Sequence, residues 1–199
     1  YAGFSVLHEE TLEPVYRKGI PVCIKNTNNP GAPGTMIVKE RSVDSEHVAG
    51  IAGDVGFSTL YISKYMMNRE VGFGRKVLQI LEEQGLSYEH VPSGIDNMSV
   101  VLRTKEFTKE KEKLVVDRIK NELAVDDIEI VPNLALVMVV GEGMRNTVGL
   151  AARATSALSK AGVNIEMINQ GSSEVSMMFG VRSSDCEVAI KVLYKEFFN

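Results

Sequence analysis

An internal repeat dominates this sequence of 199 residues and restricts the folds that it can adopt. When the chain is shifted by 77 residues, the stretch from Val71 to Gly94 aligns without a gap with the stretch from Val148 to Gly171. The identical pairs at this shift are Met67/Met144, Val71/Val148, Gly72/Gly149, Leu81/Leu158, Gly85/Gly162, Glu89/Glu166, Gly94/Gly171 and Ser99/Ser176. Three of these pairs are glycines at matching helix and turn boundaries, a placement that chance would hardly produce. Self-similarity at a fixed spacing predicts two copies of one folding unit.

The first copy has the hydrophobic pattern of a β-α-β-β-α-β unit. Alternating residues rich in β-formers predict strands, and apolar residues at helical spacing predict helices. Gly85 stands at a helix end, where glycine tolerates the left-handed conformation best. The expected elements are a strand over 59–66, a helix between Gly72 and Gly85, strands over 87–91 and 98–102 separated by a turn over 92–97, a helix over 109–123 and a strand over 127–131.

The second copy repeats this order but lacks the closing strand. Its expected elements are a strand over 134–140, a helix over 149–161, strands over 164–169 and 174–181, and a helix over 185–198. A three-stranded sheet would keep an open edge, which proteins avoid. Residues 47–52 have the pattern of a strand without a partner, and we expect them to fill that place. The first copy would then be inserted into the second, with the ends of the inserted unit close together.

Residues 1–40 have a different character. A helix is expected over 8–18, and a strand over 20–25 precedes a turn-rich loop over 26–34. Such a helix–strand pair is too small to fold alone. Because the chain also begins with Tyr1 rather than Met, we expect it to be a piece of a longer protein, with this segment the end of a larger domain.

Composition and charge argue against several classes of function. The longest apolar run, 134–140, has seven residues, whereas a membrane-spanning helix needs about 20, and no signal peptide opens the chain. A formal net charge of −4 makes a nucleic-acid partner an unfavourable hypothesis. The three histidines share no metal-ligand spacing, so no metal site is expected. Cys23 and Cys186 are far apart, which favours free thiols in a cytoplasmic protein.

Several short motifs carry a family resemblance. Residues 5–8, 20–28 and 33–35 are similar to the end of the catalytic domain of aspartate kinases, and residues 65–73 and 163–173 resemble the two ACT units of the regulatory region in that family. ACT units are small amino-acid-binding βαββαβ modules. The resemblance implies an α+β fold of two ferredoxin-like ACT domains, the first inserted into the second, each an antiparallel four-stranded sheet with two helices on one face.

The same resemblance implies a function for the parent protein. Aspartate kinases transfer the γ-phosphoryl group of ATP, with magnesium, to the side-chain carboxylate of L-aspartate, which gives 4-phospho-L-aspartate on the way to lysine, threonine and methionine. The implied parts of this chain are a remnant of the amino-acid kinase catalytic domain over 1–40, ACT domain 1 over 57–131, and ACT domain 2 formed by 45–54 with 133–199. Ser5 stands where many members carry a nucleotide-binding lysine. We therefore expect this chain alone to bind no cofactor and to catalyse nothing, whereas ATP and magnesium belong to the full-length enzyme.

The expected ligand is an end-product amino acid that inhibits the kinase. Such a zwitterion needs donors for its carboxylate and an acceptor for its ammonium, and a helix start offers unpaired N–H groups. Gly72, without a Cβ, lets a carboxylate approach the backbone there. The resemblance places effector contacts at Met67, Glu70, Phe73, Gly74, Ser87, Tyr88, Glu89, Ser93 and Gly94. Glu89 matches the acid that faces the side-chain ammonium in lysine-sensitive relatives, which favours lysine; threonine is the alternative, since its hydroxyl could use Ser87 or Ser93.

Other interpretations stay open at this stage. Gly72 and Gly149 could serve helix geometry alone, and the recurrence of Glu89 as Glu166 fits a shared structural role as well as a ligand role. The second copy offers a possible second effector site at Met144, Asn146, Gly149, Asn164, Ile165 and Glu166, or else a dimer partner for the first. We expect a homodimer joined through its ACT domains, with residues 38–46 passing the effector signal to the kinase domain. The competing hypothesis is a ligand-free ACT pair that only dimerises; a catalytic fragment would need a nucleotide site.

Overall fold

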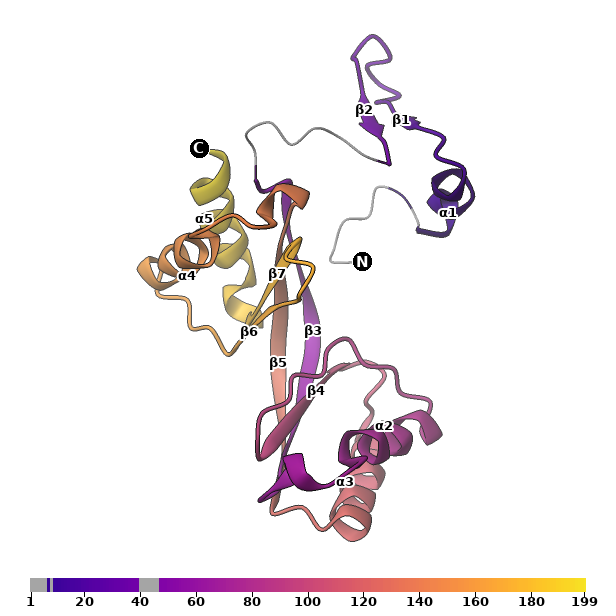
Figure 1. Ribbon diagram of the computed structural model, residues 1–199, viewed down its shortest axis with the longest axis vertical. Helices are drawn as coiled ribbons and strands as arrows, with labels where there is room; N and C mark the ends of the chain where they lie inside the picture. Colours follow the sequence, from indigo (N-terminus) through magenta and orange to yellow (C-terminus); the bar gives the residue numbers. More distant parts are fainter. Residues whose placement is uncertain (1–6, 8, 40–46) are drawn as a thin grey trace.

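The computed structural model describes residues 7, 9–39 and 47–199 (Figure 1). In the first part, the expected helix and strand are present as α1 (Glu9–Arg17) and β1 (Val22–Ile24). A further strand that the sequence did not predict, β2 (Thr35–Ile37), follows them. β1 and β2 form an antiparallel hairpin in which Val22 lies opposite Ile37. Ser5, most of the expected linker over 38–46 and the start of the segment over 45–54 lie outside the described residues.

The rest of the described chain is built around one antiparallel sheet with the strand order β4-β3-β5-β7-β6. The strands are β3 (Gly50–Ser63), β4 (Asn97–Arg103), β5 (Asp127–Val140), β6 (Met167–Gln170) and β7 (Ser176–Arg182). β3 and β5 have 14 residues each and run through the whole sheet (Figure 1). The antiparallel α+β fold is confirmed, but the two four-stranded sheets expected from the repeat are joined into one.

The two long strands serve both copies of the repeat. β3 residues 50–55 pair with β5 residues 135–140, and β3 residues 59–63 pair with β5 residues 127–131. The strands predicted over 47–52 and 59–66 are therefore two halves of β3, and those predicted over 127–131 and 134–140 are two halves of β5. The segment expected over 47–52 does fill the open place beside the carboxy-terminal strands, because Gly50–Ala52 pair with the last residues of β5.

Two irregularities mark the place where the halves meet. The pairing register of β3 and β5 shifts on either side of Phe57. Gly56 on β3 has a φ of +90°, a conformation that favours glycine, and Asn133 on β5 has a φ of 65°. A β-bulge lets a strand bend and twist while the ladder continues. Gly56 and the Pro132–Asn133 pair, which resemble strand breaks in the sequence, are therefore contained within continuous strands.

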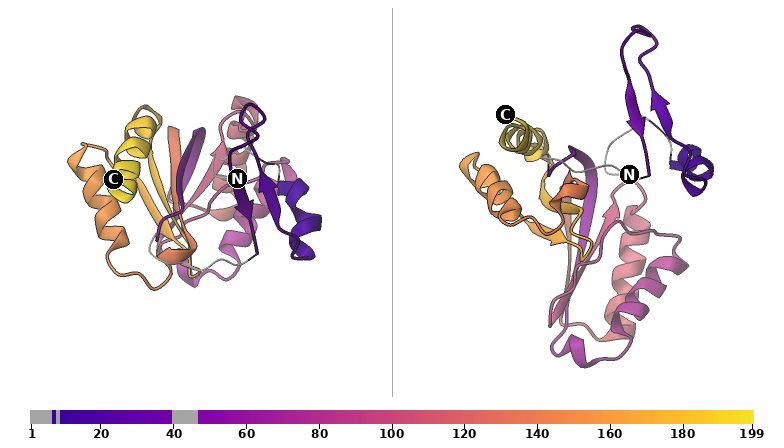
Figure 2. Two further views of the ribbon diagram at one scale, coloured as in Figure 1. Left: turned by 90° about the horizontal axis from the view of Figure 1, so that it is seen from above. Right: turned by 45° about the horizontal axis from the view of Figure 1, so that its top comes forward.

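Each half of the sheet carries its own pair of helices and its own core. We call residues 57–131 unit 1 and residues 47–55 with 134–199 unit 2. α2 (Phe73–Glu83) and α3 (Lys109–Leu123) pack on unit 1, and α4 (Leu150–Lys160) and α5 (Cys186–Phe198) pack on unit 2. The helix pairs lie on opposite sides of the long strands (Figures 1 and 2). Fully buried side chains at the two centres include Leu60, Ile62, Val77 and Ile119 in unit 1 and Val137, Leu158, Phe179 and Leu193 in unit 2.

The repeated glycines have left-handed conformations, which the sequence predicts for Gly85. Gly72 and Gly149 precede α2 and α4 with φ values of 80° and 90°. Gly85 and Gly162 follow the same two helices with φ values of 61° and 73°. All four lie in the left-handed region, where a Cβ would be strained. α3 has the predicted bounds, and the Thr108 side chain accepts a hydrogen bond from the Lys111 amide at its start.

The strand expected over 87–91 is wrong as a regular element. Glu89 and His90 both lie opposite Val101: the Glu89 N–H donates to the Val101 carbonyl, and the Val101 N–H donates to the His90 carbonyl. Two residues that oppose one in this way form a β-bulge, which locally disrupts the ladder. Two isolated bridges, at His90 and Ser93, attach the segment to β4 in place of a ladder.

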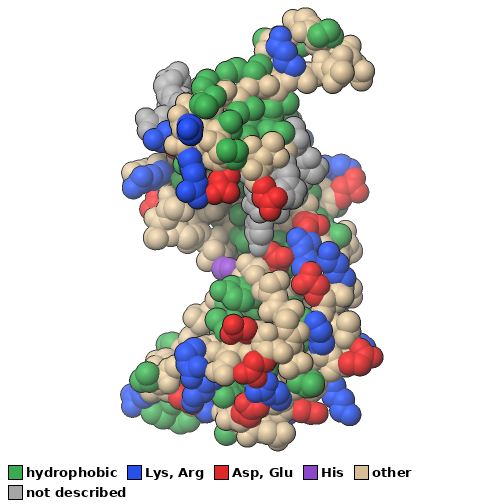
Figure 3. All heavy atoms as spheres, turned by 90° about the vertical axis from the view of Figure 1, so that its right-hand side faces the viewer, with side chains coloured by type: hydrophobic (Ala, Val, Ile, Leu, Met, Phe, Trp, Pro, Cys, Tyr) green, Lys and Arg blue, Asp and Glu red, His purple; other side chains and the backbone are tan. Residues whose placement is uncertain are grey.

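Among the described residues, no helix combines the length and the apolar character needed to cross a bilayer. Figure 3 shows acidic and basic side chains interspersed on the face that it displays, rather than a continuous basic surface.

Candidate functional site

The loop that leads into α2, which we call helix-start loop 1 (residues 64–72), is held from inside. It contains the short helix η1 (Met67–Arg69). Met67 and Phe73 are 7% and 3% exposed and belong to the core of unit 1, so they support the loop from below. Gly72 is exposed, and a Cβ on Gly74 would come no closer than 3.9 Å to Met98. The backbone at the start of α2 is therefore open to a ligand.

Glu70 fixes this loop by ion pairs. Its carboxylate lies 2.5 Å from Lys64 Nζ and 2.8 Å from Lys76 Nζ. Hydrogen bonds from Lys64 and then from Lys76 lower the pKa of Glu70 below its ordinary value. Lys64 also donates to the Leu123 carbonyl at 2.6 Å, which ties the loop to the end of α3. In this arrangement Glu70 positions the loop through two lysines.

The turn over 92–97 is the segment that the structure brings against helix-start loop 1. The Met66 amide donates to the Asp96 carboxylate at 2.8 Å, and the Asn68 amide donates to the Ile95 carbonyl at 3.1 Å. Asp96 and Ile95 are functional candidates that the sequence did not single out. Their only signal was their place in the predicted turn beside Ser93 and Gly94.

Glu89 lies elsewhere, in an ion cluster between the units. Arg103 Nε donates to Glu89 at 2.9 Å, and the same guanidinium donates to Asp54 at 2.6 Å. Arg103 also stacks over the ring of Phe57 at 4.2 Å. Burial alone would lower the pKa of Arg103, but the bonds to Asp54 and Glu89 raise it above its ordinary value. The Glu89 side chain is 14% exposed and contributes to the link between β4 and the unit 2 half of β3.

The other residues expected in the first site are divided between two places. Ser87 and Tyr88 line a shallow groove along α2 with Leu78 and Gln79. The Ser87 hydroxyl is 3.5 Å from Glu106. Ser93 and Gly94 line a different cavity, described below. The ten residues predicted for unit 1 therefore do not surround one cavity in the described chain.

Unit 2 has a cavity at the equivalent helix start. It encloses about 490 Å³ between helix-start loop 2 (residues 141–149) and the loop between β6 and β7. The Asn146 amide donates to the Glu174 carboxylate at 2.8 Å across it. Met144, which is 1% exposed, forms its floor. The residues that line it are Met144, Asn146, Thr147, Val148, Gln170, Gly171, Ser172 and Glu174.

Two of the six residues predicted for unit 2, Met144 and Asn146, are brought together there. Gly149 is exposed directly before α4, and a Cβ at this position would have no described atom within 4 Å. Asn164 and Ile165 line none of the cavities described here. The sequence missed Gln170 and Gly171, although the shift of 77 residues makes them the counterparts of Ser93 and Gly94.

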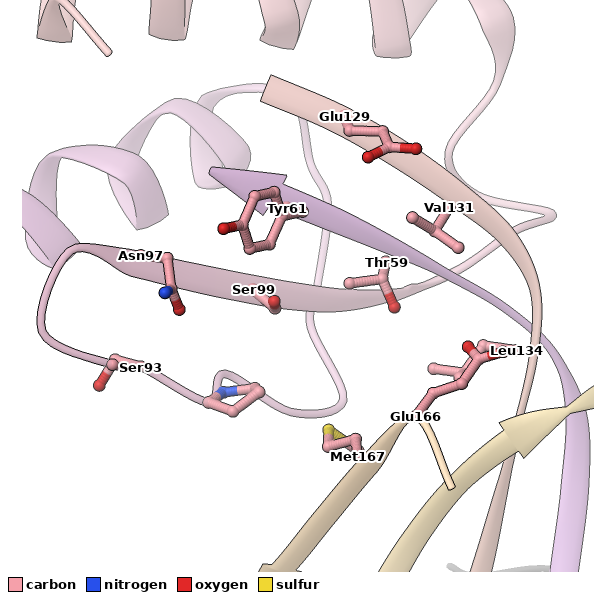
Figure 4. Close-up of a pocket in the computed structure, with 12 residues that line it drawn as sticks. Thr59, Tyr61, Ser93, Asn97, Ser99, Glu129, Val131, Leu134, Glu166 and Met167 are labelled. Atoms are coloured by element: carbon pink, nitrogen blue, oxygen red, sulfur yellow. The ribbon is translucent and has the colours of Figure 1, made fainter. Parts of the chain in front are cut away.

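A third cavity, of about 530 Å³, lies where the two units meet (Figure 4). Glu166 of unit 2 and Ser93 and Gly94 of unit 1 line it together. These residues belong to the two predicted effector sites, which the sequence placed in separate units. Nearby, burial lowers the pKa of His90, and its buried Nε2 has no hydrogen-bond partner among the described residues.

Metal binding is not suggested by any of these places. Over residues 9–39 and 47–199, no three His, Cys, Asp or Glu side chains are grouped so that they could hold a metal ion. Cys23 is exposed and Cys186 is buried, and both are free thiols.

Comparison with known proteins finds similar sequences and structures among the aspartokinases. The profile of the ACT domain matches residues 137–197. Aspartokinase 3 of Bacillus subtilis (strain 168) is 59% identical over 198 residues, which cover 100% of this chain and 44% of that enzyme. The crystal structure of Clostridium acetobutylicum aspartate kinase superimposes with a TM-score of 0.94 at 46% identity, covering 99% of this chain and 46% of that one.

Two more distant structures share the fold. The regulatory subunit of aspartate kinase from Thermus flavus has a TM-score of 0.66 at 24% identity, covering 75% of this chain and 98% of that subunit. E. coli aspartokinase III in complex with lysine and aspartate has a TM-score of 0.76 at 24% identity, covering 98% of this chain and 43% of that one. The chain spans less than half of the B. subtilis enzyme. It is homologous over its whole length to aspartokinases and has the ACT fold of their regulatory region.

Proposed function

We propose that this chain senses an end-product amino acid and, in the longer enzyme, lowers the ATP- and magnesium-dependent phosphorylation of L-aspartate. The observation that carries the proposal is the cavity of about 490 Å³ at helix-start loop 2. That volume suits an amino acid, and the cavity adjoins the N-terminus of α4, where the first N–H groups of a helix lack partners within it. On this proposal, residues 9–39 belong to the end of the kinase domain.

Lysine is the proposed effector, and threonine is the alternative. Glu174 is the only carboxylate among the described residues that line the cavity, and no described cationic side chain lines it. An ammonium group would bind Glu174, and the ligand carboxylate would bind the backbone at the start of α4. The E. coli relative whose structure contains lysine supports lysine for this family fold. Glu89 stays a prediction as a lysine contact, and it would have to exchange its bond with Arg103 for one with the ligand.

Exposed apolar side chains at the helix starts support a dimer. Val71 and Val148 are equivalent in the repeat and are 96% and 98% exposed. Tyr65 of helix-start loop 1 and Ile95 of its facing turn are also exposed, by 75% and 69%. Such a patch is typical of an interface. We propose a cytoplasmic homodimer in which effector sites lie near the contact, so that the effector favours one arrangement of units over another.

Calorimetric titration of the 199-residue chain with lysine and with threonine tests the effector proposal. Glu174→Gln should weaken lysine binding by about tenfold, because a charge-assisted hydrogen bond is lost. Asp117→Asn, an exposed site on α3 away from the cavity, should leave binding unchanged. No heat with either amino acid, together with a stable dimer, would support the ligand-free dimerisation module instead.

A further inference from the structure

The cavity between the units has no part in the function proposed above. It lies against the face of the unit 1 sheet that α2 and α3 do not cover, and the first residues of β6 close one end of it (Figure 4). The residues that line it are Thr59, Tyr61, Pro92, Ser93, Gly94, Asn97, Ser99, Glu129, Val131, Leu134, Glu166 and Met167. Both units are therefore needed to build it.

Strand alternation explains its polar wall. Leu60 and Ile62 on β3 point into the core of unit 1 and are fully buried, so Thr59 and Tyr61 between them point to the opposite face. Ser99 on β4 follows the same rule, next to the buried Val100. Alternation alone would give an ordinary solvated sheet face.

Unit 2 converts this face into a cavity. Met167 packs against the apolar cluster shared by both units, which consists of Phe57, Val101, Leu134 and Leu136. Gly180 of β7 pairs with both Met167 and Leu136, which fixes the start of β6 beside the junction. The result is an apolar end formed by Leu134 and Met167 and a polar wall formed by the unit 1 strands.

The charges in this cavity all have one sign. Glu129 and Glu166 line it, and among the described residues no Lys, Arg or His side chain does. Glu129 makes no ion pair within the described chain. The cation nearest Glu166 is Arg182, at 3.7 Å and with 71% of its side chain exposed. A pair so exposed contributes little, so both carboxylates can accept a cationic ligand.

The neutral polar groups also lack partners within the protein. The side chains of Thr59, Tyr61, Asn97 and Ser99 make no hydrogen bond to another described residue. In the view of Figure 4, Val131 lies between Glu129 and Glu166, and Leu134 lines the same cavity. An apolar strip between two carboxylates matches a short methylene chain between two cationic ends.

We propose that this cavity binds a small aliphatic diamine, with its ammonium groups at Glu129 and Glu166 and its methylene chain along Val131 and Leu134. Charge complementarity also excludes the effector of the regulatory site. Lysine carries a carboxylate, which would meet two carboxylates and no described cation here. The site is distinct from the helix-start loops and adds a second class of ligand.

Titration with pentane-1,5-diamine, which is lysine without its carboxylate, tests this. Nuclear magnetic resonance of the 199-residue chain should show saturable shifts of the amides of Ser99, Glu129 and Glu166 at millimolar diamine. Pentane-1,5-diol, of equal length and without charge, should leave these signals in place. Lysine should shift the amides of Gly149 and Gly171 instead, so that failure of the effector proposal and failure of this one are separate outcomes.

Charge-removing variants give the decisive comparison. Glu129→Gln and Glu166→Gln should each weaken diamine binding by about tenfold, the loss expected for one charge-assisted hydrogen bond. Asp117→Asn, exposed on α3 on the covered side of unit 1, should bind the diamine as the parent does. Far-ultraviolet circular dichroism confirms that each variant is folded.

Three results would overturn the proposal. The first is no shift with the diamine at the cavity amides. The second is an equal shift with the diol, which would mean that charge plays no part. The third is a shift of the same amides on dilution alone, which would mean that a second copy of the chain covers this face.

Discussion

Arg103 connects the two units through a single side chain. Its guanidinium contacts Asp54 on the unit 2 half of β3 and Glu89 on the segment beside β4, and it stacks over Phe57 at the bulge. The side chain is 26% exposed, so water screens these bonds only in part. The sequence could suggest a role for Glu89, because the repeat aligns it with Glu166. It could not show the partner of Glu89, because Arg103 lies 14 residues away at the end of β4.

Replacement of this residue should therefore destabilise the junction. We expect Arg103→Met to lower the free energy of unfolding by about 2 kcal/mol, because charge-assisted bonds to two carboxylates are lost while the apolar stem is kept. Urea denaturation of the chain measures this. Arg182→Met is the matched control, since that side chain is 71% exposed and only approaches Glu166. An equal loss in the two variants would mean that Arg103 adds no specific link.

At the scale of elements, local patterns predicted most helices and strand positions. α3 was predicted to the residue because its apolar side chains recur at helical spacing, and the structure adds the Thr108 cap at its start. The repeat located Gly72 and Gly149 at the two helix starts, whereas their left-handed conformation is a finding of the structure. The sequence did not predict that β3 is one continuous strand, because a glycine such as Gly56 usually ends a strand. In the structure Gly56 lies in a β-bulge and the pairing continues on both sides of it. The cavity at the start of α4 depends on loops that only the folded sheet brings together.

The contact that completes the second unit depends on Gly141 at the end of β5. A Cβ there would lie 2.3 Å from the His47 carbonyl oxygen and 2.8 Å from the Ala49 nitrogen, both of them backbone atoms. Ala49 N donates to the Val140 carbonyl at 2.7 Å in the same place. Gly141→Ala must therefore move the upstream segment away from β5.

We expect Gly141→Ala to cost about 1–3 kcal/mol, the range for substitutions that force backbone shifts. Thermal denaturation measures the loss, and faster hydrogen exchange of the Ala49 amide locates it. Gly31→Ala is the control, because its Cβ would have no neighbour closer than 3.9 Å. Unchanged exchange at Ala49 would contradict the assignment of this contact to the closing of the unit 2 sheet.

For the whole molecule, the shared strands couple two cores that are otherwise separate. The helices of unit 1 and unit 2 bury different clusters, and only the apolar group around Phe57 and Leu134 belongs to both. If the units were independent, each would unfold with its own free energy. Because β3 and β5 pass through both, separating one half of the sheet removes the pairing and the bulge geometry that support the other.

This coupling predicts a single cooperative transition for residues 47–199. Leu158, fully buried in unit 2, lies far from β4 in the other unit, and Leu158→Ala should cost about 2–5 kcal/mol. Native-state hydrogen exchange should then show the slowest amides of β4, such as Val100, losing protection by the same free energy as those of β7. Leu12→Ala in α1 should change neither set, since α1 packs on neither core. If the amides of β4 keep their protection in Leu158→Ala, the two units unfold separately. The effect of an effector bound to one unit could then be transmitted to the other unit only through a second chain.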